Sequence, residues 1–180
     1  VPLAGIQGVG FAFKDSAEAF RAMDGDLGNH VRDAIRAAGL YVHPKMWENG
    51  MRQITSSNKP MKTAADLDGF KIRTPPGALW VDLFKSLGAA PAPLNFSEVY
   101  TALQTRVFDG QENPYAIIDV ARLYEVQKYL SVTNHMWSGF NLMANGALWR
   151  KLPEDIQATI ERNAARFVRA QRDDQAAERE

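Results

Sequence analysis

The sequence predicts an α/β protein in which strands and helices alternate, and two observations carry this prediction. Short extended segments with alternating apolar residues, such as Phe70–Arg73, are followed by segments in which apolar residues recur at helical spacing. Glycine or proline residues separate these segments, as expected where helices and strands end. Over Gly69–Pro114 the order is strand, helix, strand, helix and strand, which predicts parallel pairing with right-handed crossovers.

The segments before this stretch are expected to supply mainly helices. Val9–Phe13 predicts a short strand or turn. Asp15 is a suitable N-terminal cap for a first helix, and a second helix is expected over Leu27–Ala38, where Gly39 stops it. Leu40–Met46 is then expected to be extended.

The segments after it are expected to return to the same alternation. A helix is predicted over Tyr115–Tyr124, followed by strands at Tyr129–Thr133 and Gly139–Ala144. A final helix begins at Pro153, a favoured residue at a first helical position, and is still running at residue 180. A helix of that length can lie across two lobes.

Changes along the chain predict two crossings between domains, one near residue 50 and one between His135 and Gly139. The expected division is residues 1–50, residues 51–137 and residues 138–180, with the third part returning to the domain of the first.

The composition is that of a globular protein and excludes several classes of function. The 21 Lys and Arg residues balance the 21 Asp and Glu residues, so no global field favours nucleic acid or anionic lipid. The absence of cysteine excludes disulfides, thiolate catalysis and cysteine-ligated zinc. No apolar run reaches the roughly 20 residues that a membrane helix needs. The opening residues show no signal peptide and the sequence stops within a helical pattern, so we expect truncation at both ends.

No arrangement of residues predicts an enzyme. His30, His43 and His135 are scattered without metal-ligand spacing. Glu98 and Glu112 are better explained by a helix start and a turn than by a catalytic carboxylate pair. Because no nucleophile, base and orienting group are brought together by a motif, we expect no catalysis, no cofactor and no metal.

Three extended segments of the central stretch end on Arg73, Phe96 and Asn113. Parallel α/β sheets bind ligands beyond the carboxyl ends of their strands. A guanidinium presents parallel donors that match a carboxylate, so Arg73 is a candidate clamp for an organic acid and Asn113 a neutral donor beside it. Structural alternatives stay open: Arg73 could be a surface residue, Phe96 a core residue, and Asn113, before Pro114, a turn residue.

Several longer motifs carry a family resemblance: Lys71–Arg73, Phe96–Thr105, Asp109–Pro114, Tyr124–Leu130 and Thr133–His135. They resemble the DctP-type substrate-binding proteins of tripartite ATP-independent periplasmic (TRAP) transporters, and the resemblance extends over nearly all 180 residues. It implies a two-lobed, periplasmic-binding-protein-like fold, each lobe a sheet flanked by helices, with a long lobe-spanning helix. It also implies family segments before Val1 and after Glu180.

The resemblance further implies a periplasmic receptor that closes on a small organic acid and delivers it to a TRAP permease. Arg73 would be the carboxylate clamp with Asn113 beside it, Arg52 a second arginine, and Phe96 an aromatic wall. Trp137, at the second crossing, is a further candidate for ligand contact. The protein is expected to be monomeric and to bind no nucleic acid.

Two alternatives remain at this point: a sensor of the same fold that signals without transport, and an α/β enzyme acting on an organic acid. The ligand class is also open. Aromatic residues at positions 80, 96 and 137 favour a monocarboxylate with an apolar body, whereas a second working arginine at position 52 would suit a diacid or hydroxy acid.

Overall fold

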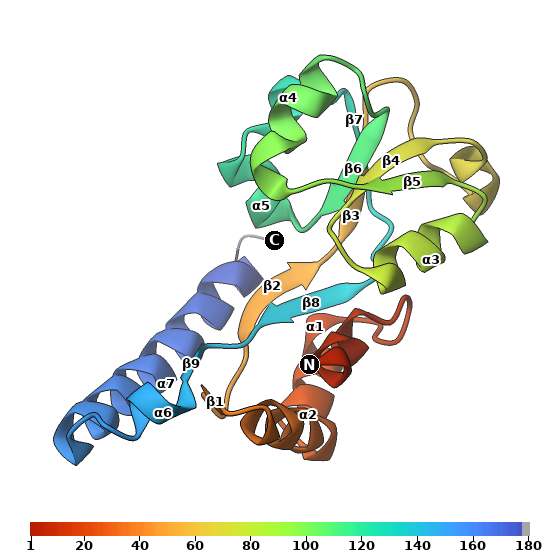
Figure 1. Cartoon of the computed structure of the whole chain (residues 1–180). Helices are drawn as coiled ribbons and strands as arrows, with labels where there is room; N and C mark the ends of the chain where they lie inside the picture. The colour runs from red at the N-terminus through yellow and green to blue at the C-terminus, as the bar shows by residue number, and fades with distance from the viewer. Residues whose placement is uncertain (178–180) are drawn as a thin grey trace. The chain divides into compact units, whose positions relative to one another are not determined.

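The computed structural model describes residues 1–177, which divide between two compact units (Figure 1). Unit 1 contains residues 1–7, 13–50 and those from 137 onward, and unit 2 contains residues 8–12 and 51–136. The sequence-based division had placed the crossings near residue 50 and between residues 135 and 139. It had grouped Gly8–Ala12 with residues 1–50, whereas these five residues group with unit 2.

Unit 1 combines helices with two small sheets. Its helices are the 3-10 helix η1 (Pro2–Gly8), whose last residue groups with unit 2, and α1 (Ser16–Met23), α2 (Asp26–Ala37), α6 (Gly146–Trp149) and α7 (Glu154–Ala177). Its strands are β1 (Leu40–Val42), β2 (Trp47–Met51), whose last residue groups with unit 2, β8 (Trp137–Phe140) and β9 (Met143–Asn145). β1 pairs with β9 in antiparallel fashion, and β2 pairs with β8.

Local sequence explains where the first helices begin and end. The Asp15 carboxylate accepts a hydrogen bond of 2.7 Å from the Glu18 amide, which confirms the predicted cap of α1. Gly39 follows α2 with φ +85°, a conformation that glycine adopts without strain. Of the strand or turn predicted for Val9–Phe13, the chain forms a turn, which follows η1.

The last third of the chain corrects two further expectations. The single strand predicted over Gly139–Ala144 is two strands, β8 and β9, because successive segments pair with different partners. The final helix begins at Glu154, and the carbonyl of Pro153 accepts from the Ile156 amide over 3.1 Å. It is described to Ala177, so its predicted continuation to residue 180 lies outside the described residues, and that it spans two lobes stays a prediction.

Unit 2 is built on one five-stranded sheet in the order β5-β4-β6-β3-β7 (Figure 1). The strands are β3 (Gln53–Ser56), β4 (Lys71–Thr74), β5 (Ala90–Pro93), β6 (Gly110–Asn113) and β7 (Tyr129–Ser131). β4 is parallel to β5 and β6, which confirms the parallel pairing predicted for the central stretch, and the proline-containing β5 is an edge strand. β3 is antiparallel to β6 and β7.

Helices flank this sheet and supply its apolar cover. They are η2 (Ala64–Leu67), α3 (Ala78–Ser86), η3 (Phe96–Glu98), α4 (Val99–Gln104), α5 (Tyr115–Val120) and η4 (Leu123–Glu125). Phe84 of α3 packs with Ile54 and Ile72, and Leu103 of α4 packs with Ile118 of α5 in a second cluster. Figure 1 shows α3 and the α4–α5 pair on different sides of the sheet.

The helix predicted over Tyr115–Tyr124 is interrupted. α5 ends at Val120, and η4 starts after Arg122, which adopts a left-handed conformation with φ 53°. Helical spacing of apolar residues does not reveal such a break, because apolar residues on both sides of it still reach the same cluster.

Candidate carboxylate-binding site

Polar side chains form a buried row where β3, β4 and β6 lie side by side. The register pairs Gln53 with Asn113 and Thr55 with Gln111, and residues paired in this way share a face of the sheet. Gln111 Nε2 donates to Thr55 Oγ1 over 2.9 Å, and Asn113 Nδ2 donates to Gln111 Oε1 over 2.6 Å. Because Arg73 pairs with Gln111, the parallel strands bring a guanidinium to the same row.

Arg73 is a buried cation without a carboxylate partner among residues 1–177. The residue is 2% exposed, and its Nε and Nη2 donate to the Leu94 carbonyl over 2.9 and 2.6 Å. Nη1 donates to no acceptor in the same described range. Burial lowers the pKa of Arg73 to about 10, and Glu112 opposes this shift. A guanidinium held only by a carbonyl keeps donors for an anion that would compensate its charge.

Arg52 is also buried, at 4% exposure, but its charge is compensated. Its guanidinium forms a bidentate ion pair with Glu112, with Nε donating to Oε2 and Nη2 donating to Oε1 over 2.9 Å. Nη2 also donates to the Glu112 carbonyl and to Asn113 Oδ1, each over 3.0 Å. The Arg52 guanidinium therefore bonds to Asn113, but it makes more hydrogen bonds to Glu112.

Glu112 is the centre of this buried cluster. Its residue is 0% exposed, and Oε2 lies 3.1 Å from His135 Nε2, whose ring contacts Thr133 Oγ1 through Nδ1 over 2.8 Å. Burial raises the pKa of Glu112, but Arg52 and His135 outweigh this effect and hold the pKa below its usual value. The turn role expected for Glu112 was wrong, since it lies within β6.

Phe96 begins η3 and lies beside Arg73. The Arg73 Cζ is 5.9 Å from the centroid of the Phe96 ring, within the range of a cation–π contact. Phe96 is 47% exposed, so it is not a core residue of unit 2. An exposed ring next to a guanidinium can present an apolar surface to a bound molecule.

Trp137 lies in unit 1, and its environment there is that of a packing residue. It is 1% exposed, and its ring meets Phe13 and Phe20 edge-on, with centroids 6.2 and 5.4 Å away. That Trp137 also contacts a ligand stays a prediction.

Comparison with known proteins decides the family. Residues 1–180 match the DctP family, described as bacterial extracellular solute-binding proteins of family 7. The chain belongs to this family.

Two curated relatives are named as periplasmic binding proteins. The chain is 40% identical over 159 residues to the 2,3-diketo-L-gulonate-binding periplasmic protein YiaO of Escherichia coli, and covers 48% of that protein. It is 35% identical over 162 residues to the sialic acid-binding periplasmic protein SiaP of Vibrio cholerae, and covers 50% of it. These alignments take in 88% and 90% of the present chain, which thus spans about half the length of these relatives.

Solved TRAP periplasmic solute-binding proteins share the fold. One from Polaromonas, bound to D-erythronate, superposes with a TM-score of 0.92 at 36% identity, over 98% of this chain and 59% of that one. Another from Sulfurospirillum deleyianum, with bound succinate, gives 0.92 at 29% identity, over 98% and 57%. A sugar acid-binding protein from Advenella mimigardefordensis, in complex with galactonate, gives 0.90 at 32% identity, over 99% and 57%. The mixed α/β fold with sheets flanked by helices is therefore confirmed.

Sequence reasoning named four residues that the structure places together in unit 2: Arg73, Asn113, Arg52 and Phe96. It did not predict that Glu112 pairs with Arg52 or that His135 contacts Glu112. The one available signal was Glu112 itself, an acidic residue inside the extended, DctP-like motif Asp109–Pro114.

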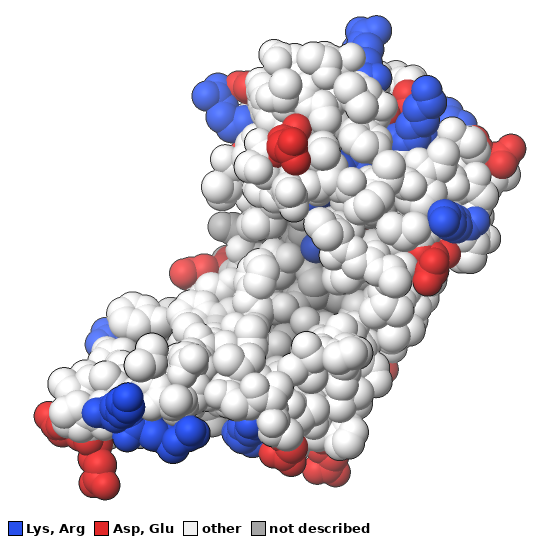
Figure 2. All heavy atoms as spheres, in the orientation of Figure 1, with Lys and Arg blue, Asp and Glu red and all other residues white. Residues whose placement is uncertain are grey.

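Surface charge does not mark a second site for an anionic partner on the face shown in Figure 2. Lys and Arg residues alternate there with Asp and Glu residues, so neither sign forms a continuous field. Within residues 1–177, no group of three or more His, Asp or Glu side chains is placed to hold a metal ion. No helix in that range is long and apolar enough to cross a membrane.

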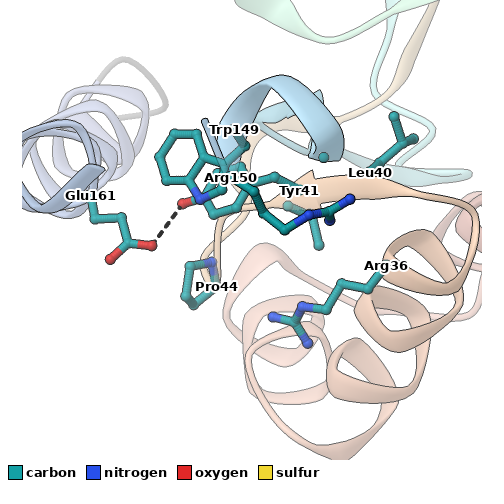
Figure 3. A pocket seen from close by; sticks show the side chains of 9 residues that line it. Arg36, Leu40, Tyr41, Pro44, Trp149, Arg150 and Glu161 are labelled. Atoms are coloured by element: carbon teal, nitrogen blue, oxygen red, sulfur yellow. Dashed lines mark hydrogen bonds between the residues drawn. The ribbon is translucent and has the colours of Figure 1, made fainter. Parts of the chain in front are cut away.

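A separate hollow of about 430 Å³ lies in unit 1 (Figure 3). The rings of Tyr41 and Trp149 stack there with centroids 3.7 Å apart, and the Tyr41 hydroxyl donates to Glu161 over 3.3 Å. Burial and Glu161 raise the pKa of Tyr41 to about 12. Arg36, on its rim, is paired with Asp33 over 2.9 Å. Two cations, Arg36 and Arg150, thus line this hollow together with one carboxylate, Glu161, which accepts from the Tyr41 hydroxyl.

Proposed function

We propose that this chain forms the ligand-binding part of a periplasmic solute receptor. The receptor holds a small organic carboxylate and delivers it to the membrane subunits of a TRAP permease. The observation that carries the proposal is Arg73, a buried guanidinium with unused donors and no carboxylate partner in residues 1–177. Membership of the DctP family supports the receptor role, and the bound organic acids of its solved relatives support the ligand class.

Each candidate residue has a distinct part in this proposal. Arg73 clamps the carboxylate through its free donors, Asn113 offers its second amide hydrogen, and Phe96 covers the ligand. Arg52 acts through its hydrogen bond to Asn113, and the carboxylate of Glu112 neutralises the positive charge of Arg52. Trp137 is retained as a contact from unit 1. The receptor works as a monomer and closes by movement of two lobes.

A thermal-shift screen with a library of organic acids tests the function. A ligand present at about 100 times its dissociation constant adds roughly 2.7 kcal/mol to the free energy of unfolding. We expect at least one carboxylate to stabilise the protein and amides of the same acids to have no effect. We expect Arg73→Ala to abolish the shift, whereas Arg106→Ala, which removes an exposed arginine of unit 2, keeps it. A library without any stabilising carboxylate would refute the proposal.

A further inference from the structure

Asn113 lies at one end of a buried chain of hydrogen bonds that crosses from β6 to β3 and ends beyond η4. Its Nδ2 donates to Gln111 Oε1 over 2.6 Å, and Gln111 Nε2 donates to Thr55 Oγ1 over 2.9 Å. Thr55 Oγ1 then donates to Gln127 Oε1, and Gln127 Nε2 donates to the Val126 carbonyl, each over 3.0 Å. Because its four side chains belong to residues that are at most 7% exposed, this hydrogen-bond chain is shielded from water.

The far end of the hydrogen-bond chain fixes the orientation of Gln111. A carbonyl can only accept, so the Val126 oxygen requires Nε2 of Gln127 and leaves Oε1 of Gln127 for Thr55. The Thr55 hydroxyl must donate to that oxygen, and it therefore accepts from Gln111 Nε2. Gln111 is thus left with its Oε1 directed at Asn113.

The near end demands the same orientation of Asn113. A guanidinium can only donate, so Arg52 Nη2, at 3.0 Å, requires Oδ1 of Asn113. An Asn113 amide rotated by 180° would place N–H groups against Arg52 and an oxygen against the Gln111 oxygen. With one Nδ2 hydrogen on Gln111, the second finds no acceptor within residues 1–177.

We propose that Gln111 is a positioning residue of the carboxylate site, which holds the Asn113 amide so that a hydrogen, and not an oxygen, is offered to the ligand. The inference rests on the proposed function, in which that hydrogen binds the carboxylate. An amide that could rotate would present its oxygen to the anion part of the time and would have to be ordered on binding. The hydrogen-bond chain orders it beforehand, and Thr55 contributes by holding Gln111.

Calorimetric titration of the full chain at pH 7 tests the inference. The probes are D-erythronate, succinate and galactonate, the ligands of three solved relatives. We expect Asn113→Ala to weaken binding by at least about tenfold and Gln111→Met by about tenfold. In the Asn113→Ala background, Gln111→Met should add less than about twofold, because Gln111 acts only through Asn113. A role in folding alone would not depend on this background.

A pair of variants at Thr55 tests the next link of the chain. Thr55→Val removes the hydroxyl at nearly constant shape, so we expect binding to weaken by about threefold. Thr55→Ser keeps the hydroxyl and should restore the affinity of the unaltered protein. The control is Ser131→Ala, which removes a buried hydroxyl of the same sheet that accepts from the Met61 amide and lies outside the hydrogen-bond chain. It should leave binding unchanged.

Nuclear magnetic resonance of the ligand-free protein measures the ordering itself. The side-chain amide signals of Asn113 are identified by their loss in Asn113→Ala. We expect the Nδ2 hydrogen bonded to Gln111 to exchange with water at least about tenfold more slowly than the same hydrogen in Gln111→Met. Equal exchange rates would overturn the inference.

The proposed function and the positioning role fail in different ways. If none of the three acids binds and the wider library also fails, both are overturned. If carboxylates bind but Gln111→Met changes the affinity by less than twofold, or weakens it equally with and without the Asn113 side chain, only the positioning role is overturned. Should Gln111→Met fail to fold, equal affinities of Thr55→Val and Thr55→Ser overturn that role.

Discussion

Arg52 and Arg73 are two arginines of one unit that are buried to nearly the same extent, at 4% and 2% exposure, yet their surroundings differ. Arg52 faces a carboxylate, a carbonyl and an amide oxygen, all within residues 112–113. Among the residues up to 177, the Arg73 guanidinium donates hydrogen bonds to one acceptor, the Leu94 carbonyl. Burial alone therefore does not identify a ligand-binding arginine. The informative quantity is the charge that the protein leaves uncompensated.

This difference in charge compensation predicts that Arg52 affects mainly the stability of the protein and Arg73 mainly the binding of a ligand. A compensated buried pair is costly to break, because removal of one partner leaves a bare charge in the interior. An uncompensated buried cation lowers stability until a ligand supplies the opposite charge. Variants at the two arginines and their partners should consequently affect different properties, and to different degrees.

The largest effect is expected on breaking the compensated pair. Glu112→Ala removes the carboxylate that binds the buried Arg52 in a bidentate ion pair, so we expect the free energy of unfolding to fall by about 3–5 kcal/mol. Urea denaturation at pH 7 measures this change. Asp82→Ala, which removes an exposed carboxylate of α3, is the control and should stay within about 0.5 kcal/mol. A loss below about 1 kcal/mol for Glu112→Ala would show that Arg52 does not depend on it.

Arg73→Met should show the opposite pattern. Removal of an uncompensated buried charge is expected to leave the ligand-free protein as stable as before or more stable. Loss of about 3 kcal/mol of charge-assisted hydrogen bonding should weaken the binding of the preferred carboxylate by about 100-fold. Urea denaturation and calorimetric titration measure the two quantities, and Arg106→Met serves as the control for both. A strongly destabilised but binding-competent variant would assign Arg73 to structure instead.

A third charge cluster, in unit 1, extends the comparison to a site near solvent. Asp24 pairs with Arg172 over 2.8 Å and with Lys45 over 3.1 Å, and the Asp24 side chain is 20% exposed. Because water screens these charges, we expect Asp24→Asn to cost only about 1 kcal/mol at pH 7. This is well below the effect at Glu112.

The pH dependence of that variant follows from the pKa of Asp24. Burial raises this pKa, but Arg172 and Lys45 outweigh burial and hold it below its ordinary value of 3.8. A lowered pKa in the folded state means that the contribution is fully present above pH 3.8 and is lost as the pH falls through the lowered value. The difference in unfolding free energy between Asp24→Asn and the unaltered protein should therefore shrink towards zero on acidification below pH 3.8. A difference that grows on acidification would contradict the pairing.

The smallest effect is expected at Phe96. A half-exposed ring at 5.9 Å from Arg73 contributes about 0.5–1 kcal/mol, so Phe96→Ala should weaken carboxylate binding less than tenfold. Phe96→Leu, which keeps an apolar cover, should weaken it less than Phe96→Ala does. Equal losses of 100-fold in both variants would mean that Phe96 orders Arg73 rather than covering the ligand.

Local sequence patterns predicted the parts of the fold that depend on neighbouring residues. The cap at Asp15, the stop at Gly39 and the parallel β4, β5 and β6 all follow from spacing within short windows. The family motifs placed Arg73 and Asn113 at one site. The Arg52–Glu112 pair could not be predicted in this way. The two residues lie 60 positions apart and are brought together by the antiparallel pairing of β3 and β6, and the sequence of neither segment indicates which strand it pairs with.

The dependence of pairing on residues distant in sequence also explains which predictions were wrong. Apolar residues at Gly139–Ala144 indicate extended chain but not that it divides between two partners. Glu112 beside Asn113 and Pro114 is typical of a turn, and only the sheet reveals that its carboxylate is 0% exposed and paired. Periodicity reports which residues are buried, whereas charge compensation depends on contacts distant in sequence.

The most direct test of the central claim is a crystal structure of the protein with its preferred carboxylate. We predict that the two carboxylate oxygens lie within about 3 Å of the donors on Nη1 and Nη2 of Arg73, while Arg52 stays bidentate on Glu112. A carboxylate bound to Arg52 in place of Glu112, with Arg73 left on the Leu94 carbonyl alone, would contradict the account.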